Sequence, residues 1–304
     1  MAGTMNRLDA NEQAFFKRQT EYIKSKTYDK KYRMLKAKQF IPVSTEVPSG
    51  SQFVTWRSFS KIGQAKIIAD YANDFPRVDV YGEENTAKVY GIGSSYGYSI
   101  VEIRRAQMAG VNLSTMRADA ARRAHEEKED KLAWLGDADY NIPGFIDYPG
   151  ITEGTLTTGA GGNTWALKTP DEIIADFTAL KLAVSVPTNG VEEITQILLP
   201  RAQYELVNSK RMTDTNKTIL AYFRDNNPGV SVDVLDQLDG AGDSGKDRMM
   251  GYVKDPDHLV QEIPQMFEQM DPDTVGMEYV TACHSEFGCV VVYYPSSVAY
   301  IDGI

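Results

Sequence analysis

Apolar residues recur at helical spacing between residues 113 and 136, in the longest such pattern of the sequence. Met116, Ala120, Ala124 and Leu132 mark the apolar positions, and charged residues fill most of the others. The small alanines leave room for a neighbouring backbone, and the glycine that closes the range is a typical stop signal. The pattern predicts one long helix with a narrow buried face.

The charged positions of this helix are ordered in a way that favours it. Asp119 precedes Arg123 by four residues, and Glu127 precedes Lys131 by four. In this order an intrahelical ion pair contributes about 0.2–0.5 kcal/mol. The acidic residues from 126 to 130 belong to this polar surface, so the pattern predicts that they are exposed and do not form a catalytic acid–base pair.

A second helix is predicted from its start signals. Thr169 and Glu172 have the spacing of a capping box, and Pro170 stands at the first helical position. The apolar residues that follow at helical spacing predict a buried stripe of Ile173, Phe177, Leu180 and Val184.

Residues with high β-propensity form short runs along most of the chain. They predict strands at 52–60, 78–81, 87–92, 96–104, 194–199, 230–235, 248–253, 289–294 and 297–301. Short helices are expected within 61–74 and at 218–223, and the Gly/Thr-rich residues 150–164 are typical of a flexible connection. This mixed order with long-range returns predicts an α+β fold.

Composition and charge narrow the classes of protein. A chain of 304 residues with 42% hydrophobic content can bury a sizeable core. The sequence has no apolar run of 18 residues and begins with a polar segment, so we expect neither a membrane span nor a signal peptide, and synthesis in the cytosol. The net charge is −10, but residues 1–45 hold 10 Lys/Arg against 4 Asp/Glu, which leaves −16 for the rest. A basic arm therefore precedes an acidic body.

One segment has the spacing of a nucleotide-binding motif. Gly240-Ala-Gly-Asp-Ser-Gly-Lys246 matches the glycines and lysine of a P-loop and follows a predicted strand. A P-loop also needs a hydroxyl after its lysine and a helix whose N-terminus faces the phosphates. Here Asp247 replaces the hydroxyl, Asp243 adds a second negative charge, and a β-prone run follows. The sequence favours a tight surface loop over the site of a P-loop NTPase.

The cysteines and histidines do not form a recognisable site. Cys283 and Cys289 lack the paired spacing of a zinc site, and His284 would supply a third ligand at most. If the β-prone runs on either side of these cysteines paired as a hairpin, the sulfurs could face each other, but the cytosol favours free, buried thiols. We expect His125 and His258 to be surface or packing residues, and His284 to lie in the hairpin loop. We expect no catalytic residue, metal or cofactor.

The order of these parts resembles the major capsid protein of tailed bacteriophages, whose fold is shared by encapsulin shells. In that family an extended loop leads into a spine helix with an Arg-rich first half, an acidic second half and a Leu-Gly exit. The matching residues here are Arg122-Arg123-Ala124, Glu126-Glu127, Glu129-Asp130 and Leu135-Gly136. Two later segments resemble the second peripheral helix and the opening of the central domain: 169–177 and 197–204. The resemblance spans about residues 50–304.

The resemblance implies the phage major-capsid fold, an α+β subunit with five parts. These are an N-terminal arm at 1–49, an extended loop at 50–95, a peripheral domain at 96–193 with the spine helix at 113–135, a central axial domain at 194–272, and C-terminal strands at 273–304 that return to both domains. Only about 45 residues precede the loop, too few for a scaffolding domain. If assembly needs scaffolding, we expect a separate protein to provide it.

The function implied by the resemblance is structural and not enzymatic. Copies of the chain would form hexamers and pentamers of an icosahedral shell around double-stranded DNA, in a virion assembled in the host bacterial cytoplasm. A portal, and in some members a cement protein, would be further partners, and contact with DNA would be weak and non-specific. The alternatives are an encapsulin-like nanocompartment shell, a P-loop NTPase, and an adaptor or tail component.

The candidate contacts between subunits come from three places. Aromatic residues of the thin extended loop cannot form a core alone, so we expect them to pack on neighbours. Basic residues of the arm and charges of the spine helix are the other candidates. The full set is Lys17, Arg18, Lys30, Arg33, Phe53, Trp56, Phe59, Arg122, Arg123, Glu126 and Glu127.

Overall fold

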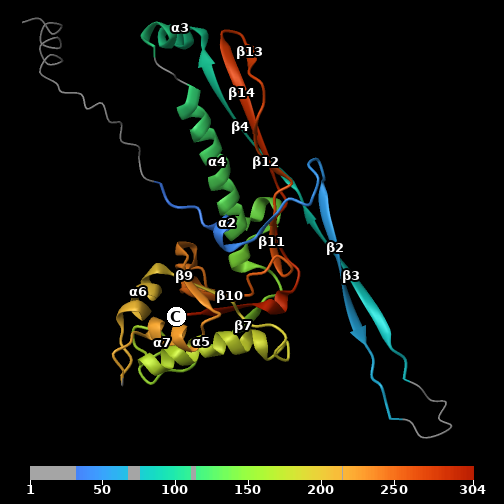
Figure 1. The fold of residues 1–304 in the computed structure, drawn as a ribbon, viewed down its shortest axis with the longest axis vertical. Coiled ribbons are helices and arrows are strands. Elements are labelled where there is room, and N and C mark those ends of the chain that lie inside the picture. The colour runs from blue at the N-terminus through green and yellow to red at the C-terminus, as the bar shows by residue number, and fades with distance from the viewer. Residues whose placement is uncertain (1–31, 68–75, 111–113, 214) are drawn as a thin grey trace, which may run out of the picture. The chain divides into compact units, whose positions relative to one another are not determined.

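The computed structural model describes residues 32–67, 76–110, 114–213 and 215–304 (Figure 1). The chain divides into two compact units, Met1–Met34 and Leu35–Ile304. The elements described below belong to the second unit.

This unit contains both helices and strands. The α-helices are α2 (Ala37–Phe40), α3 (Ile100–Ala109), α4 (Ser114–Leu135), α5 (Pro170–Ser185), α6 (Arg201–Ser209) and α7 (Ile219–Asn226). The strands are β1 (Val43–Ser44), β2 (Phe53–Ile62), β3 (Asp79–Lys88), β4 (Tyr90–Ser99), β5 (Gly136–Asp137), β6 (Ile142–Pro143), β7 (Thr152–Gly154), β8 (Gln196–Leu199), β9 (Ser231–Val234), β10 (Arg248–Tyr252), β11 (Leu259–Glu262), β12 (Gln265–Gln269), β13 (Asp273–Val275), β14 (Glu278–Phe287), β15 (Val290–Val292) and β16 (Val298–Asp302).

A five-stranded mixed sheet has the order β7-β16-β10-β8-β9. Its middle strand β10 is antiparallel to both neighbours, whereas the outer pairs are parallel. Successive side chains of a strand point to opposite faces. Met249 thus joins the core beneath α5 and α7, while Met250 joins a second core on the other face. Because both faces are covered, this strand is apolar along most of its length.

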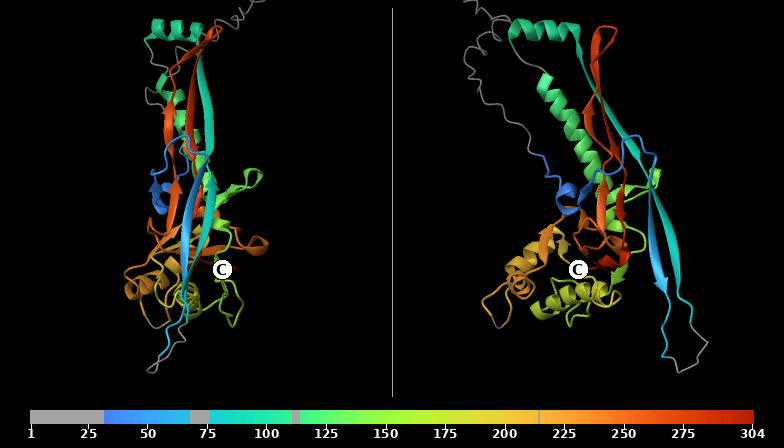
Figure 2. Two further views of the ribbon diagram at one scale, coloured as in Figure 1. Left: turned by 90° about the vertical axis from the view of Figure 1, so that its right-hand side faces the viewer. Right: turned by 45° about the vertical axis from the view of Figure 1, so that its right-hand side comes forward.

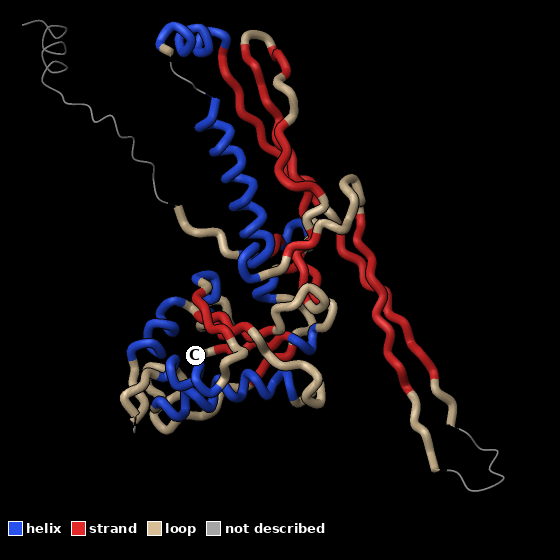
Figure 3. Tube along the Cα trace, viewed as in Figure 1, coloured by secondary structure: helices blue, strands red, loops and turns tan. Residues whose placement is uncertain are grey.

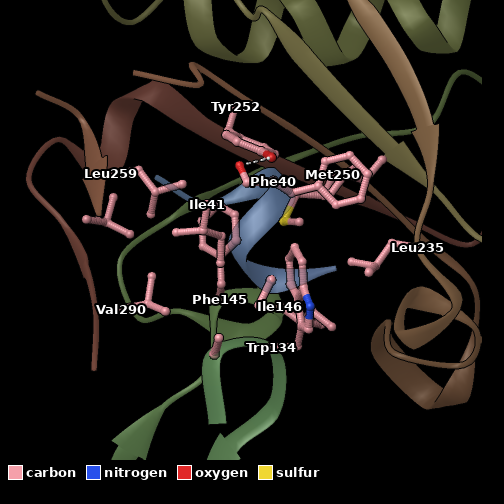
Figure 4. Close-up of a cluster of buried hydrophobic side chains, with 14 of the residues drawn as sticks. Phe40, Ile41, Trp134, Phe145, Ile146, Leu235, Met250, Tyr252, Leu259 and Val290 are labelled. Carbon is pink, nitrogen blue, oxygen red and sulfur yellow. Dashed lines mark hydrogen bonds between the residues drawn. The ribbon is translucent and has the colours of Figure 1, made fainter. Parts of the chain in front are cut away.

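The second core joins α2, the end of α4 and the sheet (Figure 4). The rings of Phe145 and Tyr252 meet edge to face with centroids 5.2 Å apart, and Trp134 lies between Phe40 and Phe145 at 6.4 and 6.1 Å. The Tyr252 hydroxyl donates to the Phe40 carbonyl at 2.9 Å. These contacts attach α2, near the start of the unit, to a strand about 200 residues later in the sequence.

Helix α5 confirms its sequence prediction. Thr169 and Glu172 form the capping box, and all four residues of the predicted stripe are fully buried. Beside the stripe, the Asp176 carboxylate accepts hydrogen bonds from Lys168 Nζ at 2.5 Å and from Trp165 Nε1 at 2.9 Å. Lys168 and Asp176 form an ion pair in which both side chains are wholly buried. The backbone N–H of Thr157 also donates to Asp176, at 2.9 Å. The prediction of a flexible connection at 150–164 was wrong, because this network and strand β7 hold that segment.

A second sheet runs beside α4 (Figure 3). Its strand β14 pairs with β4 from Glu278–Ser99 to Phe287–Tyr90, and with β12 and β13 along its other edge. The predicted strand at 96–104 is therefore half wrong, since β4 stops at Ser99 and α3 begins. Ser99 and Glu102 form a capping box that ends the strand.

Helix α4 ends as predicted but buries a different face. Leu135 is its last residue, and Gly136 follows with φ +67°, where a Cβ would lie 2.2 Å from the Ile142 carbonyl oxygen. Met116, Ala120 and Ala124 of the predicted stripe are exposed, and Leu132 alone of the four is buried. The buried positions include three polar residues, His125, Glu129 and Asp130. The prediction that the acidic residues at 126–130 are all exposed was thus wrong for the last two of them.

Two further predictions change in position. A short helix was expected within 61–74, but residues 61–67 are not helical: β2 continues to Ile62, and residues 63–67 have no regular structure. Residues 68–75 lie outside the described part. The run at 87–92 is divided between β3 and β4 at Val89.

Candidate assembly interface

The extended hairpin, formed by β2 and β3, offers apolar side chains to the surroundings. Figure 2 shows that it runs clear of the two sheets along most of its length. Phe59 is 68% exposed and Phe53 58%. The structure adds Val80 and Tyr81, both more than half exposed, which the sequence showed only as a short apolar run in a polar segment. Exposed apolar side chains in a two-stranded ribbon indicate a surface that a partner covers.

One face of the extended hairpin is ordered by cross-strand pairs. Thr55 and Thr86 hydroxyls lie 3.2 Å apart, and Arg57 Nε lies 3.5 Å from Glu84 Oε2. Next along this face, the Phe59 ring covers Gly82, where a Cβ would lie 3.0 Å from the ring. The absence of a side chain at position 82 lets the ring lie against the opposite strand. The aromatic surface is thereby held in place before any partner binds.

Trp56 has a different setting from the other two loop aromatics. It is half-buried, and its ring meets that of Tyr293 edge to face with centroids 5.9 Å apart. Tyr293 follows β15, so this contact attaches the root of the extended hairpin to the rest of the unit. Of the three candidate aromatics, Phe53 and Phe59 are the ones left open to a neighbour.

The candidate charges of the spine helix pair with one another. Arg122 Nε lies 3.3 Å from Glu126 Oε1, and Arg123 Nε lies 2.8 Å from Glu127 Oε1. All four side chains keep contact with solvent, where such pairs contribute about 0.3–0.5 kcal/mol. They are on the surface and remain candidates for contacts between subunits.

The arm candidates fall mainly outside the described part of the chain. Lys17, Arg18 and Lys30 precede residue 32, whereas Arg33 is described and exposed. Their role in contacts between subunits stays a prediction.

His125 joins the spine helix to the second sheet. Its Nε2 lies 2.9 Å from the Ser94 hydroxyl of β4, and its Nδ1 lies 2.8 Å from the Ser285 hydroxyl of β14. The ring also meets Phe267 of β12 edge to face, 5.0 Å between centroids. Burial lowers the pKa of His125 below its ordinary value. The Glu129 carboxylate opposes this shift, and His284, in β14, adds to it.

This setting predicts a loss of stability in mild acid. The contribution of the neutral imidazole is complete above the unfolded-state pKa of about 6.5 and is lost as the pH falls from there through the lower folded-state pKa. We expect the free energy of unfolding to fall more steeply from pH 7 to pH 5 in the natural protein than in His125→Gln. Denaturant unfolding at a series of pH values measures this, and parallel curves for the two proteins would contradict it.

The segment with P-loop spacing is a closed loop. The Gly240 N–H donates to the Asp247 carboxylate at 3.1 Å, and the Asp243 N–H donates to Asp302 at 2.9 Å. Strand β10 follows Lys246 two residues later, in the place where a nucleotide site needs a helix. Backbone donors that would bind phosphate are thus occupied by carboxylates of the same chain.

We therefore expect Lys246→Ala to be nearly silent. Thermal stability and particle formation should match those of the natural protein, because an exposed lysine beside acidic residues contributes at most about 1 kcal/mol. The purified natural protein should not hydrolyse ATP or GTP when magnesium is present. Hydrolysis that disappears in the alanine variant would contradict the non-enzymatic assignment.

The two cysteines do not meet across a hairpin. Cys283 and His284 both lie inside β14, which continues to Phe287, and Cys289 follows in a turn with φ +68°. The expectation that His284 lies in a hairpin loop was wrong. Both thiols are free and buried, and burial raises the pKa of Cys289 to about 12. Thiols of this kind are unreactive.

Within the described ranges, no three His, Cys, Asp or Glu side chains come together as metal ligands would. In the same ranges, no helix has the length and apolar character needed to cross a membrane.

Comparison with known proteins identifies the family. The profile of the major capsid protein family matches residues 63–304. No curated protein matches the sequence.

Among solved structures, the capsid of Myoviridae phage XM1 is similar with a TM-score of 0.80 and 18% identity, over 94% of this chain and 98% of that one. The capsid of a native GTA particle, computed with C5 symmetry, gives 0.67 and 11% identity over 98% and 99%. A virus-like particle from Pyrococcus furiosus gives 0.51 and 14% identity over 86% and 90%. The chain shares its fold with these capsid proteins and belongs to the major capsid protein family.

Proposed function

We propose that copies of this chain form hexamers and pentamers that close into an icosahedral shell around double-stranded DNA. The observation that carries the proposal is the extended hairpin, whose exposed Phe53, Phe59 and Val80 have no core of their own. Repeated binding of this surface to an adjacent copy, around a closed ring, buries it on every subunit. The similar GTA capsid, whose structure was computed with C5 symmetry, supports five-fold rings.

The arrangement of elements supports the division into an arm at 1–49, an extended loop at 50–95, a peripheral domain at 96–193, an axial domain at 194–272 and returning strands at 273–304. Strand β14 lies beside β4, which crosses from the extended loop into the peripheral domain, while β16 lies beside β10 of the axial domain. The last segment thus serves both domains in this proposal.

The remaining partners follow from the same proposal. A separate scaffolding protein and a portal would assist closure in the host cytoplasm, and a cement protein could bind the outside. DNA contact would be weak and non-specific, because residues after 45 carry a net charge of −16. The charged arm is the part best suited to approach DNA or an acidic neighbour.

An encapsulin-like compartment is the second candidate, supported by the similarity to the virus-like particle of Pyrococcus furiosus. The two candidates differ in what the shell encloses. Nuclease-protected DNA inside purified particles supports a phage shell, whereas an enclosed protein and no DNA supports a compartment.

The experiment that tests the proposal is electron microscopy of the expressed protein, with size-exclusion chromatography of the same sample. We expect rings of five and six subunits and closed particles, with the extended hairpin of each subunit against its neighbour. A protein that stays monomeric at high concentration, with a scaffolding protein from the same source added, would contradict the proposal.

A further inference from the structure

A small cavity lies between the spine helix, α2 and β11. Its volume is about 230 Å³, several times the space that one water molecule occupies, about 30 Å³. Six residues line it: Leu35, Ala37, Lys38, Glu126, Asp130 and Gln261. Leu35 and Ala37 form an apolar wall of the cavity. The other four residues line its remaining sides with polar groups.

Gln261 is the unusual member of this lining. Its side chain is fully buried, yet neither Oε1 nor Nε2 has a hydrogen-bond partner within the described structure. Its backbone is fixed, because β11 is the middle strand between β1 and β15 and the Gln261 N–H donates to the Pro42 carbonyl at 2.7 Å. A buried amide without hydrogen-bond partners destabilises the subunit that contains it. The amide is therefore suited to a group that enters from outside the subunit.

The charge around the cavity indicates a cation. Glu126, Glu129 and Asp130 project from neighbouring turns of α4, and the first two pair with Arg122 and Lys38 at 3.3 and 2.8 Å. Asp130 has no Lys or Arg partner within the described residues. Its Oδ1 accepts hydrogen bonds from the backbone N–H groups of Lys36 and Ala37, both at 2.8 Å. Its Oδ2 accepts one hydrogen bond within the described residues, from the side-chain amide of Gln237 at 3.4 Å. One nearly buried carboxylate oxygen thus remains poorly satisfied beside the unpaired amide.

We infer that the Gln261 cavity receives a lysine side chain from the basic N-terminal segment, residues 1–31, of a neighbouring copy. Such a side chain donates to Asp130 Oδ2 and Gln261 Oε1, while its methylene stem lies along Leu35 and Ala37. A carbonyl of the incoming segment accepts from Gln261 Nε2, which a free metal ion or amine could not do. Residues 1–31 carry seven Lys/Arg against four Asp/Glu, so their charge complements the acidic cavity. The inference rests on the proposed shell function.

Isotope-coded crosslinking of assembled particles tests the inference. Equal amounts of ¹⁴N- and ¹⁵N-labelled protein are assembled together and treated with a carbodiimide, which joins a carboxylate to an amine only where the two are in contact. Mass spectrometry should find peptides with Glu126 or Asp130 joined to peptides with an arm lysine of the other isotope. The candidate lysines are Lys17, Lys24, Lys26, Lys30 and Lys31.

Gln261→Leu removes both polar atoms and keeps most of the volume. The yield of the mixed-isotope link should fall about fivefold or more, the change expected from losing one hydrogen bond. Gln39→Leu is the matched control, because Gln39 lies on α2 but is exposed and outside the cavity lining, and its yield should equal that of the natural protein. Unassembled Gln261→Leu should be at least as stable as unassembled natural protein.

Three results would overturn the inference. The first is a set of particles without arm links, which means that no arm lysine occupies the cavity. The second is links confined to one isotope, and the third is a link yield in Gln261→Leu equal to that in Gln39→Leu. In each case micrographs still show particles, so the proposed function survives. If the natural protein forms no particles at all, the proposed function itself has failed.

Discussion

We expect Asp176→Ala to lower the free energy of unfolding by about 3–5 kcal/mol. The substitution leaves the Lys168 ammonium buried without a counter-charge, and it removes the acceptor of Trp165 Nε1 and of the Thr157 backbone N–H. Denaturant unfolding of the unassembled protein, followed by circular dichroism, measures the change.

Two variants show whether the buried charge is the cause. Lys168→Met combined with Asp176→Asn removes both charges and should recover part of the loss. Asp225→Ala breaks the ion pair with Lys217, in which both side chains are more than half exposed, and should cost at most about 1 kcal/mol. A similar loss for Asp176→Ala and Asp225→Ala would show that the buried pair has no special weight.

Phe59→Ser should abolish most particle formation while the subunit remains folded. The Phe59 ring is 68% exposed and lies over Gly82. It therefore contributes little to the stability of the isolated subunit and is available for contact with a neighbouring subunit. An aromatic residue at the centre of an interface contributes about 2 kcal/mol or more, which is roughly a 30-fold change in the association constant of each contact. Many contacts in one shell multiply that effect. Light scattering against protein concentration measures it.

Phe59→Leu is the control for this experiment, because it keeps an apolar side chain and should retain most of the assembly. Trp56→Ser is expected to act differently, since Trp56 packs on Tyr293 and the change loosens the root of the extended hairpin. Normal particle formation by Phe59→Ser at the concentrations used for the natural protein would exclude this face from the interface.

The helices illustrate what the sequence could predict. The start of α5 and its buried stripe were predicted correctly, because the capping residues and the apolar spacing agree with the packing that the sheet imposes. The length and end of α4 were also correct, since they depend on local signals. Its buried face was not, because His125, Glu129 and Asp130 are buried through partners on distant strands and on α2. Hydropathy cannot show such partners.

The missed helix α3 had a local signal. Ser99 and Glu102 have the capping-box spacing, but the alternating tyrosines before them favoured a longer strand. For the candidate interface, the sequence identified the exposed Phe53 and Phe59 but could not separate them from Trp56. That distinction depends on Tyr293, more than 200 residues away in the chain.

The pairing of β4 with β14 also constrains when the subunit can fold. The two strands are separated by roughly 180 residues, and contacts between such distant segments form late because long loops must close first. At about 5–20 residues per second, a ribosome needs roughly 10 to 35 seconds between making the first strand and the second. Throughout that interval the edge of β4 that pairs with β14 is unpaired. The base of the extended hairpin also lacks its contact with Tyr293, which has not yet been synthesised. A chain interrupted before β14 therefore lacks both the partner strand of β4 and the Tyr293 ring on which Trp56 packs, so its hairpin is not attached to the rest of the subunit.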